Sequence, residues 1–114
     1  MHNVASSHVR FSPAEHANFV AGKVVAYALA YLEGRNDAEH LARNTRSVQL
    51  ELLIAAEDLQ AKAILDAARL LTVAMTGAAA AIGDARQDRW QRLMGDLVEL
   101  VRLESSELRG GPRE

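Results

Sequence analysis

VVAYALAYL, residues 24–32, is a stretch without a single charged side chain, and its only polar atoms besides the backbone are two tyrosine hydroxyls. It lies in a chain that has no proline between Pro13 and Pro112 and is rich in Ala and Leu. Both residues favour helix because they lose little side-chain entropy when the backbone coils. A helix that is apolar all round is buried on several sides, either as a central helix or as one shared with a second subunit.

The composition therefore predicts an all-α fold, an antiparallel bundle of three to five helices that associates with itself. We expect a flexible N-terminal arm over residues 1–11, a single helical domain over 12–109, and a free C-terminal tail over 110–114. One domain is the normal outcome for a chain of this length.

Helix boundaries are visible in the short polar segments. Residues 12–15 (SPAE) combine an N-cap serine, a proline at the first helical position and an acid in the first turn, so a helix should begin there and end near Gly34. Phe11 is placed to pack back onto that helix. Asn36 or Asp37 should cap the next helix. The final helix is expected over about 85–108, after a stop at Gly83 and an N-cap at Asp84.

The middle segment, 38–76, carries a helical pattern throughout. As one helix it would be about 58 Å long, too long for a compact domain of this size. We therefore expect a break at residues 44–47 (NTRS), in preference to a long projecting helix. The expected core positions of this segment are Leu41, Val48, Leu52, Ala56, Leu59, Ala63, Ala67, Leu70 and Ala74; those of the final helix are Trp90, Leu93, Met94, Leu97, Leu100, Val101 and Leu108.

Composition also limits the class of partner. The net charge of −2 provides no field for extensive nucleic-acid contact. The uncharged runs, 24–32 and 70–83, are shorter than the roughly 20 residues that span a bilayer, so no membrane association is expected. The absence of cysteine is typical of a cytoplasmic protein.

Metal and cofactor motifs are weak. A di-iron bundle needs Glu-x-x-His on two helices, and this chain has only the adjacent pairs at 15–16 and 39–40. No phosphate-binding glycine loop or nucleophile turn is present. We expect no metal and no cofactor.

One short motif suggests catalysis. Residues 35–40 (RNDAEH) resemble the Arg-x(4–6)-His signature of the HEPN family of small helical ribonucleases. The resemblance implies a ribonuclease or toxin in which Arg35 orients a phosphate and His40 transfers a proton. Arg10 and His16 match the same spacing. The activity of the chain as an enzyme stays open at this point.

The apolar excess of residues 24–32 favours a different function, a non-enzymatic interaction or assembly protein that acts as a small subunit, adaptor or regulator. We expect a two-fold homodimer, or a complex with another protein, through an interface made by Val24, Tyr27, Ala28, Tyr31 and Leu32. A ligand-sensing bundle with a pocket around Tyr27, Tyr31 and Trp90 is the other alternative.

Overall fold

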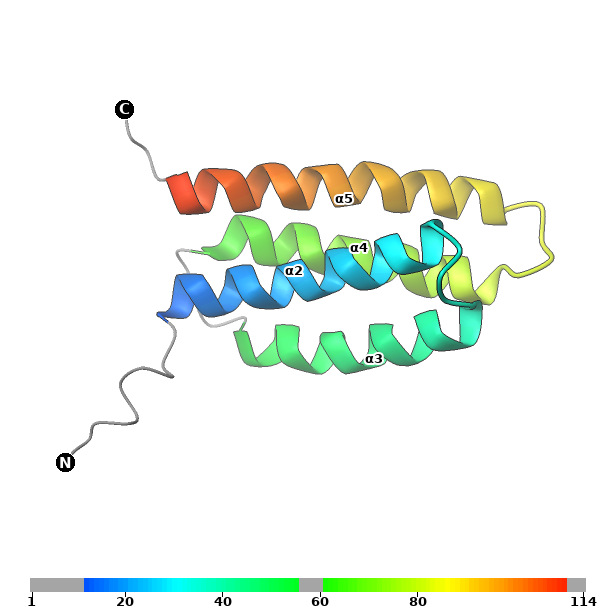
Figure 1. Ribbon diagram of the computed structural model, residues 1–114, viewed down its shortest axis with the longest axis horizontal. Helices are drawn as coiled ribbons and strands as arrows, with labels where there is room; N and C mark the ends of the chain where they lie inside the picture. Colours follow the sequence, from blue (N-terminus) through cyan, green and yellow to red (C-terminus); the bar gives the residue numbers. More distant parts are fainter. Residues whose placement is uncertain (1–11, 56–60, 111–114) are drawn as a thin grey trace.

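Four helices account for most of the residues that the computed structural model describes, 12–55 and 61–110 (Figure 1). They are α2 (Pro13–Leu32), α3 (Ala38–Ala55), α4 (Lys62–Ala80) and α5 (Gln87–Gly110). Successive helices run in opposite directions, and the described residues form no strand. The predicted all-α antiparallel bundle is confirmed. The expected N-terminal arm, the packing of Phe11, and residues 56–60 and 111–114 lie outside the described residues.

The start of α2 follows from its first four residues. The backbone N–H of Glu15 donates to Ser12 Oγ at 3.1 Å, and the backbone N–H of Ser12 donates to Glu15 Oε1 at 2.9 Å. This reciprocal capping box satisfies two amides that the helix itself leaves unpaired. At the other end Glu33 is the C-cap, and Gly34 follows it with φ +79°, a conformation that suits glycine. The predicted start is confirmed, and the glycine lies one residue beyond the cap.

A pair of helices, α2 and α4, forms the centre of the bundle, with α3 and α5 on opposite sides of it (Figure 1). Helix α2 contacts all three of the others. Val24, Val25, Ala28 and Ala30 are buried by these contacts. The apolar run at 24–32 is thus explained by a central helix, the first of the two possibilities that the sequence left open.

The break predicted at residues 44–47 is wrong, because α3 continues through them. Thr45 is buried, and its hydroxyl donates to the carbonyl of Leu41, one turn earlier, at 2.6 Å. Val48 is also buried, so these residues belong to the core face of the helix. The chain does form two helices here, but α3 ends at Ala55 and α4 begins at Lys62.

The core face of α4 agrees with the predicted one at Ala67 and Ala74 and differs from it at two other positions. The structure buries Ile64, Leu65, Ala67, Ala68, Leu71, Thr72, Ala74, Met75 and Ala78. Ala63 and Leu70, both expected in the core, are exposed. The prediction assumed that a single helical repeat continues from α3 into α4. Because the chain reverses direction between these helices, the repeat in α4 starts from a different position.

The turn between α4 and α5 contains Gly83, with φ +78°, and Asp84. The Asp84 carboxylate accepts the N–H of Arg86 at 2.9 Å and its carbonyl accepts the N–H of Gln87 at 3.0 Å. Asp84 therefore stabilises the turn before α5 rather than capping the helix itself. Helix α5 buries Met94, Val98 and Val101, leaves Leu93 exposed, and continues to Gly110, one residue past the expected domain boundary.

Candidate interaction surface

The residues predicted to form an interface lie mostly inside the bundle. Val24 and Ala28 have no exposed surface, and Tyr27, Tyr31 and Leu32 are partly buried against the core. Val24 and Ala28 thus offer nothing for a second copy to contact, and the prediction is wrong for these two residues. Its error was to treat the apolar excess of α2 as larger than the neighbouring helices can cover, whereas α3, α4 and α5 all pack on α2.

The aromatic residues of the predicted ligand pocket point to different neighbours. The Tyr31 hydroxyl accepts hydrogen bonds from Gln87 Nε2 at 2.8 Å and Gln91 Nε2 at 3.4 Å, so it joins α2 to α5. A hollow of about 250 Å³ lies beside Trp90 and is lined by Arg86, Arg89, Trp90 and Leu93. Neither tyrosine lines that hollow, so it is not the pocket that the sequence suggested.

On the other side of α2, an ion pair joins it to α3. Lys23 Nζ lies 2.7 Å from Glu51 Oε2 and 5.6 Å from the centre of the Phe19 ring. The hydrogen bond to Glu51 raises the pKa of Lys23, with a smaller contribution from the nearby Tyr27 hydroxyl, while desolvation opposes the rise. The pair links the two helices through one charge-assisted hydrogen bond at a partly exposed position.

Arg35 and His40, the residues of the ribonuclease resemblance, lie in and just after the α2–α3 connection. Each is held by its own carboxylate: Arg35 Nη2 donates to Glu33 Oε1 at 2.6 Å, and His40 Nδ1 lies 2.7 Å from Asp37 Oδ1. The His40 backbone N–H also donates to Asp37, which makes Asp37 the N-terminal cap of α3 and lowers its pKa. Both the arginine and the histidine side chains are more than half exposed.

The largest concentration of exposed apolar side chains is on α3. Leu50, Leu53 and Ile54 are 65%, 69% and 73% exposed, although they lie within five residues of one another. At this spacing they occupy adjacent positions on one side of the helix. Arg46 lies one turn before Leu50 and is exposed as well. We call these four residues, Arg46, Leu50, Leu53 and Ile54, the α3 surface.

A groove between α3 and α4 borders this surface. One part, of about 360 Å³, is lined by Gln49, Leu52, Leu53, Arg69, Thr72 and Val73. A second part, of about 400 Å³, shares Gln49 and is lined by Arg46 and by small residues of both helices. Alanines at positions 42, 79 and 80 line this part, and Leu53 and Val73 make the other part apolar.

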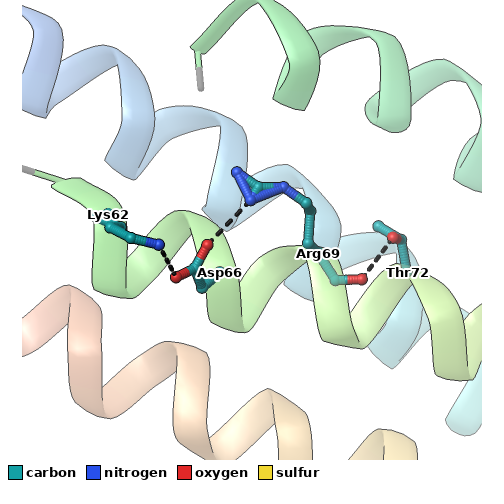
Figure 2. A network of polar contacts seen from close by, with 4 residues as sticks. All are labelled: Lys62, Asp66, Arg69 and Thr72. Carbon is teal, nitrogen blue, oxygen red and sulfur yellow. Dashed lines mark hydrogen bonds and ion pairs between the residues drawn. The ribbon is translucent and has the colours of Figure 1, made fainter. Parts of the chain in front are cut away.

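A polar network along α4 positions the arginine of this groove (Figure 2). Lys62 Nζ donates to Asp66 Oδ2 at 2.8 Å, and Arg69 Nη1 donates to Asp66 Oδ1 at 2.9 Å. The Thr72 hydroxyl donates to the Arg69 carbonyl at 2.7 Å. The two cations lower the pKa of Asp66, with the Lys62 hydrogen bond as the main cause.

Helix α5 has an exposed side of its own. Leu103 is 56% exposed, Leu100 is half-buried and Glu107 is exposed. Their intervals of three and four residues place them on one side of the helix. We call Leu100, Leu103 and Glu107 the α5 surface. Sequence reasoning missed both surfaces, although residues 50–54 (LELLI) carry four large apolar side chains where the core of α3 takes only Leu52.

Residues 12–55 and 61–110 contain no group of three or more His, Cys, Asp or Glu side chains that could hold a metal ion. In the same residues, α4 is the one helix with the length and mean hydropathy (1.4) of a membrane-spanning segment, and half of that window is buried inside the bundle. The core helix of a soluble bundle has the same properties.

No protein-family model, curated protein or solved structure matches this chain. The resemblance to the HEPN ribonucleases therefore depends on residues 35–40 alone.

Proposed function

We propose that this protein is a non-enzymatic helical interaction or assembly protein of the cytoplasm, and that it binds its partner through the α3 surface. The observation that carries the proposal is the exposure of Leu50, Leu53 and Ile54 by about two-thirds or more within five residues of one helix. Single exposed leucines are common on soluble proteins, but contiguous apolar groups next to a groove are typical of binding surfaces.

The energetic argument supports the same proposal. Fully burying a Leu or Ile side chain contributes about 1.5–3 kcal/mol. A partner that covers these three side chains would gain several kcal/mol before the costs of association. The adjoining groove is lined by Leu53 and Val73, which extends the apolar contact from α3 to α4. A partner helix laid along α3 would contact both, as in other helix-in-groove complexes.

The catalytic alternative has less support. The Arg35 guanidinium is paired with Glu33 and the His40 ring with Asp37. Such pairing stabilises a turn and a helix start, which explains both residues without a reaction. The proposal therefore assigns them a structural role.

Cross-linking in intact cells tests the proposed function. A tagged wild-type protein is compared with Leu53→Asp, which removes an exposed apolar side chain, and with Ala26→Asp, which places the same charge on an exposed position of α2. Circular dichroism verifies that both variants fold.

We expect a cross-linked polypeptide, whether another protein or a further copy of this one, with wild type and Ala26→Asp and its loss with Leu53→Asp. An identical pattern for all three proteins, or no cross-linked polypeptide at all, would contradict the proposal.

A further inference from the structure

Three residues of the α3 surface have counterparts in the α5 surface when the two helices run in opposite directions. Along α3, Arg46 is followed by Leu50 and Leu53, at intervals of four and three residues. Backwards along α5, Glu107 is followed by Leu103 and Leu100, at the same two intervals. These are the spacings of one side of a helix in a paired-helix seam.

The charges of the two surfaces are complementary. Among residues 12–55 and 61–110, neither Arg46 nor Glu107 has an ion-pair partner. An antiparallel contact would place the Arg46 guanidinium opposite the Glu107 carboxylate, Leu50 opposite Leu103, and Leu53 opposite Leu100. The contact would therefore pair one cation with one anion and place the exposed leucines of α3 against leucines of α5.

We infer that the partner at the α3 surface is a second copy of this chain, which contributes its α5 surface in antiparallel orientation. This inference rests on the proposed function and specifies the partner. The contact is heterologous, since two different surfaces of the same chain meet.

The arrangement of the bundle then determines the form of the assembly. Helices α3 and α5 lie on opposite sides of the central pair α2 and α4 (Figure 1). With its two contacting helices on opposite sides of the bundle, one copy binds two different neighbours, one at α3 and one at α5. Each added copy leaves one α3 surface and one α5 surface free, and the assembly grows as an open chain. Because the contact is antiparallel, each copy is rotated by about 180° relative to its neighbour, around the axis that joins α5 to α3.

The contact should be weak. Two helices that meet over about three turns bury less than the roughly 1,600 Å² of a standard stable interface. We therefore expect a concentration-dependent series of dimers, trimers and larger species rather than one stable oligomer.

Sedimentation velocity of three proteins tests the inference, with Leu53→Glu blocking the α3 surface and Leu103→Glu blocking the α5 surface. Both substituted side chains are more than half exposed, so both variants should fold. Wild type should show an average mass that rises beyond the dimer between micromolar and millimolar concentrations. Each variant alone should stay monomeric. An equimolar mixture should form a dimer and stop there, because one free α5 surface meets one free α3 surface.

Charge reversal tests the pairing of Arg46 with Glu107. Arg46→Glu and Glu107→Arg should each weaken association about tenfold or more, because like charges then face each other. The double variant and the mixture of the two single variants should both recover wild-type association.

Two results would overturn the inference. One is wild type that remains monomeric throughout the concentration range; the other is Leu103→Glu that associates as wild type does. Cross-linking that depends on Leu53 together with a monomeric wild type would refute the second-copy inference and leave the proposed function standing. Failure of both experiments would refute the proposed function as well.

Discussion

The indole of Trp90 on α5 lies directly over the α carbon of Gly77 on α4. A β carbon built at Gly77 would be 2.5 Å from both Cδ2 and Cε2 of the ring, closer than any real carbon contact. Gly77 therefore permits the close approach of these two helices, and the ring takes the space that a side chain would fill. Trp90 is only partly buried by this contact, and its outer side borders the hollow formed with Arg86, Arg89 and Leu93.

Replacing this glycine should destabilise the bundle. In Gly77→Ala the new methyl group must displace the Trp90 ring, and overpacking of this kind costs about 1–3 kcal/mol. Alanine's higher helix propensity returns up to about 1 kcal/mol. We expect a net loss in the free energy of unfolding of up to about 2 kcal/mol. Urea denaturation followed by Trp90 fluorescence measures it, and the native emission should also shift as the ring moves.

Two other helical glycines provide matched controls. A β carbon at Gly22 or Gly95 would meet nothing within 4 Å. Gly22→Ala and Gly95→Ala should therefore raise the free energy of unfolding by about 0.5–1 kcal/mol. If Gly77→Ala stabilised the protein to the same extent, the close packing of Trp90 would be disproved.

The capping box at the start of α2 should make a measurable contribution. Ser12→Ala removes the acceptor of the Glu15 amide and should lower the free energy of unfolding by about 1 kcal/mol. Ser47→Ala is the comparison, since Ser47 is exposed within α3, where alanine is the better helix former. It should leave stability equal or slightly higher. Equal losses in the two variants would argue against a specific cap.

Acid should weaken the α4–α5 turn through Asp84. Its hydrogen bonds with Arg86, first from the guanidinium and then from the backbone N–H, lower the pKa of Asp84 to about 2 from an ordinary value of 3.8. Because the folded pKa is the lower one, this stabilisation is present above pH 3.8 and is lost as the pH falls towards 2.

Thermal denaturation between pH 5 and pH 2 measures this loss. The slope of interest is the fall in melting temperature per pH unit. Asp37 and Asp66, whose pKa values are also lowered, increase this slope in wild type. Asp84→Asn should reduce the slope, Arg86→Leu should reduce it by a smaller amount because the backbone N–H of residue 86 still donates to Asp84, and the double variant should have the slope of Asp84→Asn. Unchanged slopes in both single variants would contradict the assigned role of the pair.

RNA should survive incubation with the wild-type protein. The non-enzymatic function predicts that a mixed RNA substrate stays intact at neutral pH, and that Arg35→Ala and His40→Ala give the same result. Gel electrophoresis of the RNA is sufficient. Cleavage by wild type that His40→Ala abolishes would refute the proposed function and support the ribonuclease alternative.

Features set by neighbouring residues were predictable from the sequence. The capping of α2 depends on Ser12 and Glu15, three positions apart, and was predicted from local pattern. For the start of α3 the pattern offered Asn36 or Asp37, and the structure has Asp37 as the cap. Helix content followed from the absence of proline and from the Ala- and Leu-rich composition. These signals need no knowledge of tertiary contacts.

Features set by packing were not predictable. Thr45 looked like part of a helix break, yet its hydroxyl donates to the Leu41 carbonyl and the residue is buried. Val24 looked like an interface residue because the sequence of α2 alone does not show how many helices pack against it. Leu50 and Leu53 were passed over for the corresponding reason, since only the bundle shows that nothing within the described residues covers them.

The hydrogen bonds of α2 with α5 bear on how the chain folds during synthesis. Ser105 Oγ donates to Asn18 Oδ1 across 87 residues of sequence, and Gln87 donates to Tyr31 across 56. Helices α2, α3 and α4 can pair as hairpins as soon as each leaves the ribosome, because their contacts are closer in sequence. One flank of α2, however, stays uncovered until α5 has emerged. The nascent chain must therefore carry this flank of α2 uncovered until α5 has been synthesised, which makes the interval before α5 appears the period of greatest risk of aggregation.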